Sequence, residues 1–152
     1  MAPHVPSRQG RVVGVDLGSR RIGIAVTDSA RTMALPRTTL TRTGDRERDR
    51  RALVELVLEE EASLVVVGLP LSLDGSHGRA AVEASDEAGE LRSLLLPHAI
   101  DVELFDERLT TVTAHQALTA GGAGGRARRE VVDKAAATVM LGAWLESAGS
   151  TP

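Results

Sequence analysis

The stretch "VVGVDLGSRRIGIAVTD", residues 12–28, decides how the chain begins to fold. Two apolar runs rich in Val and Ile, residues 11–17 and 22–28, flank a short Gly-Ser-Arg-Arg segment. Branched apolar residues favour strands, and a short connection that starts with glycine favours a hairpin. The stretch therefore predicts two strands joined by a tight turn, with Asp16 near the end of the first and Asp28 closing the second.

Helix and strand patterns alternate along the rest of the chain. Residues 31–41 read as a third strand, at an edge or with a bulge because of Pro36, and Asp45 is a candidate N-cap for the helix that follows. Together these patterns predict an α/β fold: a mixed central sheet started by an antiparallel meander, with helices on both faces. The further strands are expected at 64–70 and 100–105, and the helices at 45–60, 77–96, 110–120 and 130–147.

Length and composition limit the class of protein. The chain has 152 residues, 42% of them hydrophobic and 26% charged, which suits one domain, predicted at 11–147 with flexible tails at 1–10 and 148–152. No apolar run approaches the roughly 20 residues that span a bilayer, so no membrane association is expected. The absence of cysteine excludes disulfides and thiolate metal sites and favours a cytoplasmic location. Aromatic residues make up only 1%, which argues against reading single strands by base stacking.

The basic residues are grouped, although the net charge is −3. All of the 18 except Lys134 are arginine, whose planar fork suits phosphate. The set at 46–51 alternates with acids and is interpreted as solvated surface. The segment "GGAGGRARR", residues 121–129, is predicted to be a flexible basic loop that contacts a phosphate backbone. The candidates for substrate binding are Arg20, Arg21, Arg108, Arg126, Arg128 and Arg129.

Three acidic residues lie where sheet ends and a helix could meet. Asp16 is near the end of the first strand, Glu107 follows the last strand, and Asp133 lies at the start of the C-terminal helix. If the first and last strands are sheet neighbours, Asp16 and Glu107 can meet at one end of the sheet, and a helix packed across that end could add Asp133. Crowded carboxylates resist ionising unless a divalent cation such as Mg²⁺ joins them. The spacing alone leaves open whether each acid is simply a surface charge or a cap.

Four motifs in this order resemble the YqgF/RuvX family of RNase H-like nucleases: "GVDLGSRRIGIAVTD", "VVVGLPLSLDGSHG", "DERLTT" and "DKAAATVMLGAWL". The resemblance covers about residues 11–145. It implies an RNase H-like fold and phosphodiester hydrolysis with Mg²⁺ or Mn²⁺, two ions being expected. It also implies that Asp16, Glu107 and Asp133 are the catalytic and metal-binding triad. The family is described as maturing the 5′ end of precursor 16S ribosomal RNA, and also as resolving Holliday junctions.

Three other residues of these motifs are expected to support the acidic site or the turns around it. Asp28 is interpreted as a turn residue, and Asp106 as a weaker ligand candidate than Glu107 because neighbours on a strand face opposite sides. Gly18 is interpreted as a tight-turn glycine beside the acidic site.

Alternatives to an RNA-processing nuclease remain at this point. An ATP-handling enzyme of the actin, Hsp70 and sugar-kinase type also begins with a segment like "GVDLGS", although such enzymes pair two domains around the nucleotide. A non-catalytic nucleic-acid-binding protein of the same fold is another possibility. Within the nuclease interpretation, structured RNA is the preferred partner and branched DNA the alternative. A resolvase should be a twofold dimer, and the residues are compatible with a monomer or a homodimer.

Overall fold

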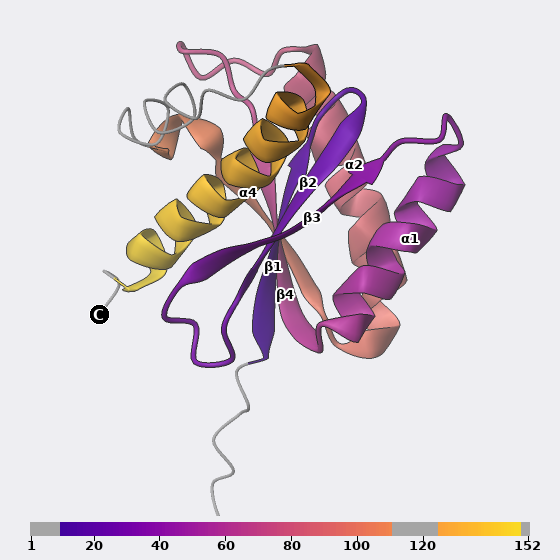
Figure 1. Cartoon of the computed structure of the whole chain (residues 1–152), viewed down its shortest axis with the longest axis vertical. Coiled ribbons are helices and arrows are strands. Elements are labelled where there is room, and N and C mark those ends of the chain that lie inside the picture. The colour runs from indigo at the N-terminus through magenta and orange to yellow at the C-terminus, as the bar shows by residue number, and fades with distance from the viewer. Residues whose placement is uncertain (1–9, 111–124, 150–152) are drawn as a thin grey trace, which may run out of the picture.

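A computed structural model describes the backbone of residues 10–110 and 125–149, and the side chains of 10–110 and 135–148. Five strands form one sheet in the order β3-β2-β1-β4-β5 (Figure 1). The first three strands pair antiparallel, whereas β4 lies parallel to both β1 and β5. This is the mixed sheet with an antiparallel meander that the sequence predicts. The strands are β1 (Arg11–Leu17), β2 (Arg21–Thr27), β3 (Ala34–Thr41), β4 (Ala62–Leu69) and β5 (Asp101–Asp106).

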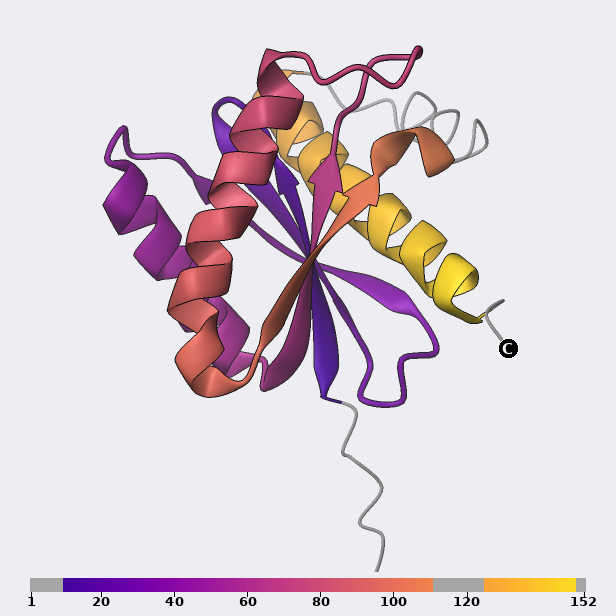
Figure 2. The same cartoon turned by 180° about the vertical axis from the view of Figure 1, so that it is seen from behind.

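Helices cover both faces of the sheet, as Figures 1 and 2 show from opposite sides. Helices α1 (Arg46–Glu59) and α2 (Arg79–Leu95) lie on one face, and α4 (Gly125–Gly149) crosses the other. Short 3₁₀ turns, η1 (Leu96–His98) and η2 (Glu107–Leu109), follow α2 and β5. Each face of the sheet therefore has its own apolar core.

Alternation along the central strands separates these two cores. Val13 and Val15 of β1 pack with Leu53 and Leu91 under α1 and α2, whereas Val12 packs with residues of α4. Successive strand residues point to opposite faces, so residues 12–15 of β1 and 64–68 of β4 are buried on both sides of the sheet.

Most local signals in the sequence act as expected. The Asp45 side chain accepts hydrogen bonds from the backbone N–H groups of Glu47 and Arg48, so it is the N-cap of α1. Pro36 lies on the edge strand β3, where the register with β2 shifts opposite Ile24 and Ala25. Helix α2 ends just before Pro97, which falls in η1.

One local prediction was wrong in its boundary. The predicted loop at 121–129 gives way to helix at Gly125, so Arg126, Arg128 and Arg129 belong to the first turns of α4. The segment after Gly125, "RARRE", consists of strong helix formers. The helix therefore begins five residues earlier than predicted. The predicted helix at 110–120 lies, apart from Thr110, outside the described residues.

No helix in the described part of the chain combines the length and the apolar composition needed to cross a membrane.

Candidate active site

Asp16 lies on the α4 face of the sheet, near the carboxyl end of β1. Gly14, two residues earlier on the same face, approaches α4 so closely that an added Cβ would lie 3.0 Å from the Cβ of Leu141. Because side chains alternate along a strand, Asp16 points to the same side as Gly14. Its side chain is partly buried. The carboxylate therefore lies at the sheet edge, beyond the packed contact between β1 and α4.

Glu107 reaches the same edge from the other side of β4, which lies between β1 and β5, so the first and last strands are not the neighbours that the sequence prediction assumed. It is the first residue of η2, directly after β5, and β1, β4 and β5 run parallel, so their carboxyl ends lie together. Its carboxyl group extends over Gly68 of β4: a Cβ on Gly68 would overlap the Oε1 atom and would lie 3.1 Å from Cδ. Gly68 is buried and adjoins Val67, the partner of Val15 in β1. The glycine thus leaves the space in which the two acids meet.

Asp16 and Glu107 are in direct contact. A hydrogen bond joins their side chains, which requires a proton on one of the two carboxyl groups. Burial raises the pKa of Glu107 to about 8, and the charge of Asp16, its hydrogen bond and the charge of Asp106 add to this rise. The pair therefore favours a shared proton or a bound cation over two free negative charges.

The third predicted acid, Asp133, lies in α4, one helical turn before the buried Ala137. Its side chain falls outside the described residues, as do those of Arg126, Arg128 and Arg129. Among the side chains of 10–110 and 135–148, no three His, Asp or Glu residues are grouped so as to hold a metal ion. The structure thus brings together the two acids of the triad whose side chains it describes.

Asp106 and Glu107 have opposite environments although they are adjacent in sequence. Asp106 accepts bonds from the Arg108 guanidinium, with Nη2 at 2.7 Å and Nε at 3.0 Å, and from the Arg108 backbone N–H at 2.9 Å. These bonds hold the pKa of Asp106 below its usual value. The Arg108 Nη1 also donates to the Leu73 carbonyl oxygen at 3.4 Å, so Arg108 joins η2 to the loop before α2. The Arg108 guanidinium, which the sequence predicts to contact substrate, bonds to Asp106 and Leu73 of the protein itself.

The β1–β2 turn carries the other described arginines of the predicted site. Arg20 is exposed in the turn, and Arg21 is half-buried as the first residue of β2. A Cβ on Gly18 would lie 2.5 Å from the Arg21 carbonyl oxygen, so the turn closes only with glycine at this position. Asp28, at the far end of β2, accepts hydrogen bonds from the backbone N–H groups of Thr32 and Met33. It is a turn residue and lies apart from the acidic pair.

Gly68 was missed by the sequence analysis, although it lies in the quoted motif "VVVGLP". A glycine that interrupts an apolar strand run often marks a close approach of another group. That signal was available, but the approaching group, Glu107, lies far along the chain and only the sheet order identifies it.

Comparison with known proteins agrees with this geometry. A family model described as "RuvX: Holliday junction resolvase" matches residues 10–147. The chain belongs to the RuvX family.

Curated relatives in the RuvX family carry the name "Putative pre-16S rRNA nuclease". The relative from Rhodococcus opacus (strain B4) is 44% identical over 141 residues, covering 91% of this chain and 78% of the relative. The relative from Thermobifida fusca (strain YX) is 47% identical over 141 residues, covering 88% and 86% respectively. These are the similarities that the four motifs indicated.

Solved structures with this fold include two junction resolvases. Thermus thermophilus RuvC in complex with a Holliday junction substrate aligns with a TM-score of 0.59 at 14% identity, covering 93% of this chain and 97% of RuvC. The yeast mitochondrial Holliday junction resolvase Ydc2 aligns with a TM-score of 0.55 at 11% identity, covering 90% of this chain and 78% of Ydc2. At such identities the likeness concerns the fold alone, and that fold is RNase H-like.

Proposed function

We propose that this RuvX-family chain is a metal-dependent nuclease that hydrolyses phosphodiester bonds, with precursor 16S ribosomal RNA as its substrate. The contact between the Asp16 and Glu107 carboxyl groups at the sheet edge is the observation that carries the proposal. The names of the curated relatives support the choice of substrate. Precursor ribosomal RNA and the lack of cysteine both favour the cytoplasm as the place of action.

The acidic pair fits a divalent cation by its chemistry. Both groups are carboxylates, the oxygen ligands that Mg²⁺ and Mn²⁺ favour. Burial and the charge of Asp16 raise the pKa of Glu107, and a bound cation would offset both effects. Asp16 and Glu107 would hold the metal, with Asp133 of α4 as the third proposed ligand. Two bound ions would activate a water molecule and stabilise the leaving oxygen of the phosphodiester.

The remaining proposed contributions come from the chain itself. Gly68 keeps the Glu107 carboxyl group over the end of β4 and beside Asp16. Arg108 fixes η2, on which Glu107 lies, through Asp106. We assign Arg20 and Arg21 to the substrate backbone because the β1–β2 turn follows Asp16 directly, and we assign Arg126, Arg128 and Arg129 to it because they begin α4.

Junction resolution is the second candidate. It is favoured by the description of the family model, and it requires two active sites related by a twofold axis. A monomeric chain would favour RNA processing, and a homodimer would be compatible with both.

One experiment separates the candidates. The same preparation is offered precursor 16S ribosomal RNA and a four-way DNA junction, each with Mg²⁺, with Mn²⁺ and with a chelator. We expect metal-dependent cleavage of the RNA. Symmetric cleavage of the junction alone would support the resolvase instead. Binding to either substrate without cleavage under all conditions would show a binding protein that has kept the fold.

A further inference from the structure

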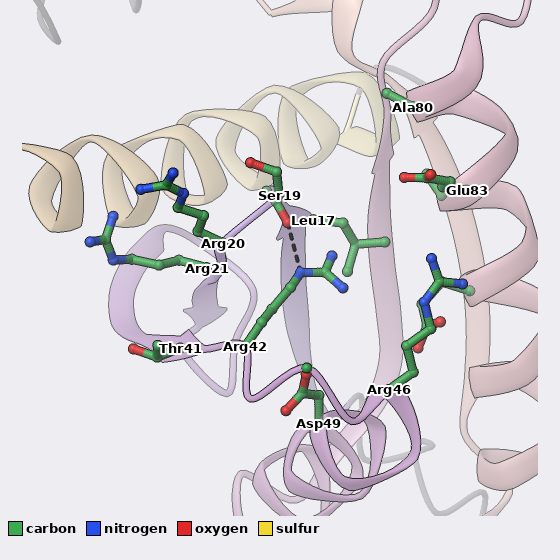
Figure 3. Close-up of a pocket in the computed structure, with 14 residues that line it drawn as sticks. Leu17, Ser19, Arg20, Arg21, Thr41, Arg42, Arg46, Asp49, Ala80 and Glu83 are labelled. Carbon is green, nitrogen blue, oxygen red and sulfur yellow. Dashed lines mark hydrogen bonds between the residues drawn. The ribbon is translucent and has the colours of Figure 1, made fainter.

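A cleft of about 640 Å³ opens beside the carboxyl end of β1, on the face of the sheet covered by α1 and α2 (Figure 3). Its walls are the β1–β2 turn, the segment between β3 and α1, and the first turns of α2. Leu17 and Gly18 line it and directly follow Asp16 in the chain. The cleft and the acidic pair therefore lie on opposite faces of the same strand end.

Two arginines enter the cleft from the segment that leads into α1. Figure 3 shows Arg42 and Arg46 directed between the β1–β2 turn and α2, whereas Arg20 and Arg21 extend away from them. The Arg42 Nε atom donates to the Gly18 carbonyl oxygen at 2.8 Å. In the part of the chain with described side chains, no other side-chain bond of Arg42 occurs, and Arg46 makes none. Both therefore have nitrogens available to a ligand.

The segment that carries these arginines is fixed by hydrogen bonds. The carboxylate of the buried Asp49 accepts bonds from the Thr43 backbone N–H at 3.1 Å and from its hydroxyl at 2.7 Å. The Arg42 backbone N–H donates to the Arg20 carbonyl oxygen at 2.9 Å. A ligand would meet an ordered backbone and a fixed Arg42 side chain, which lowers the entropy cost of binding.

The opposite wall supplies two carboxylates, each of which pairs with an arginine. Glu87 receives two bonds from Arg50, at 2.8 and 2.9 Å, and Glu83 lies 3.4 Å from Arg79. The cleft is thus positive on one side and offers hydrogen-bond acceptors on the other. Ala80, in the first turn of α2, also lines it, and this helix begins without a side-chain cap. The positive end of the helix dipole adds to the attraction of an anion.

We propose that this cleft binds one nucleotide of the substrate strand, at the end of β1 that also carries Asp16. Its phosphate is held by Arg42 and Arg46, and donor groups of its sugar or base face the wall of Glu83 and Glu87. A nucleotide can contact both walls, whereas a bare anion would contact the arginines alone. The inference deepens the proposed function and rests on it.

A matched pair of variants tests the proposal. Arg46 and Arg48 are both exposed in the first turn of α1, and neither side chain has a described partner, but only Arg46 lines the cleft. The affinity of a short single-stranded RNA oligonucleotide is measured by fluorescence anisotropy with a chelator present, so that nothing is cut. We expect Arg46→Gln to weaken binding about tenfold and to reduce the salt dependence by about one phosphate contact. Arg48→Gln should bind as the wild type does.

A competition experiment tests the nucleotide itself. A nucleoside monophosphate should displace the oligonucleotide from the wild-type protein at a lower concentration than inorganic phosphate does, and Arg46→Gln should reduce this difference. Equal losses in Arg46→Gln and Arg48→Gln, no loss in either, or equal displacement by inorganic phosphate would each overturn the proposal. Because no cleavage is needed, the difference between the two variants can persist even if neither precursor RNA nor a junction is cut. In that case the nuclease proposal fails and the nucleotide site stands.

Discussion

On the α4 face of the sheet, the end of β1 presents the Asp16 carboxyl group to that of Glu107; on the face of α1 and α2, the same strand end borders Arg42 and Arg46. The first region concentrates negative charge, and the pKa of Glu107 in it is raised. In the second, two arginines keep unused donors. In the proposed function, one face of the sheet would carry the hydrolytic residues and the other would bind the nucleic-acid strand.

The sharpest way to break this contrast is to remove one acid. Asp16→Asn should reduce cleavage at least about a thousandfold, because the loss of a metal-binding carboxylate costs several kcal/mol of transition-state stabilisation. Oligonucleotide affinity should stay near that of the wild type, since the arginine cleft is unchanged. Asp101→Asn, an exposed acid at the start of β5, is the control and should cut normally. Near-wild-type cleavage by Asp16→Asn would rule out the proposed metal site.

A methyl group at Gly68 should disturb the acidic region without touching a charge. The new Cβ would displace the Glu107 carboxyl group, so we expect Gly68→Ala to lower the cleavage rate about 10- to 100-fold and the free energy of unfolding by about 1–3 kcal/mol. Gly89→Ala is a matched control in α2, where nothing lies within 4 Å of an added Cβ. It should raise the stability by up to about 1 kcal/mol. Equal activity of the two variants would show that Gly68 does not position Glu107.

Substitution of Arg108 tests whether every arginine near the acidic pair contributes to substrate binding. Because its guanidinium is bonded to Asp106, Arg108→Gln should lower kcat less than about fivefold and leave KM nearly unchanged. Arg20→Gln, at the exposed turn, should instead raise KM. A large rise of KM in Arg108→Gln would show that this arginine leaves Asp106 to bind substrate.

The raised pKa of Glu107 predicts how the stability of the metal-free protein depends on pH. The folded pKa of about 8 exceeds the ordinary value of 4.5, so the contribution of the protonated group is complete below the ordinary pKa and is lost as pH rises through about 8. With a chelator present, Tm should fall by several degrees across this range, and added Mg²⁺ should restore more of it at the alkaline end. Glu107→Gln should remove this part of the pH dependence. The same fall in the variant would assign the effect to other groups.

The sequence predicted that Asp16 and Glu107 meet, but on the assumption that the first and last strands are neighbours. Strand β4 lies between them, and Glu107 reaches Asp16 across Gly68. Parallel strands end at one edge, and this follows from the pattern of elements without any side-chain detail. The role of Gly68 and the bonding of Arg108 could not be obtained in this way, since each depends on which group approaches after the chain has folded. The arginines at 46–51 were all interpreted as solvated surface. That Arg46 lines the cleft and Arg48 does not likewise depends on how α1 is turned toward α2. The glycines of 121–125 predict a loop, but the helix formers that follow them extend α4 back to Gly125.

The two hydrogen bonds of Arg42 have a mechanical consequence. Its backbone N–H holds the Arg20 carbonyl oxygen and its side chain holds that of Gly18, so one residue fastens both sides of the β1–β2 turn. This turn fixes the end of β1, where Asp16 lies. A phosphate bound to the outer nitrogens of Arg42 would therefore contact the same residue that holds the turn after Asp16. In the proposed function, substrate binding and the position of Asp16 would thus be linked through one residue.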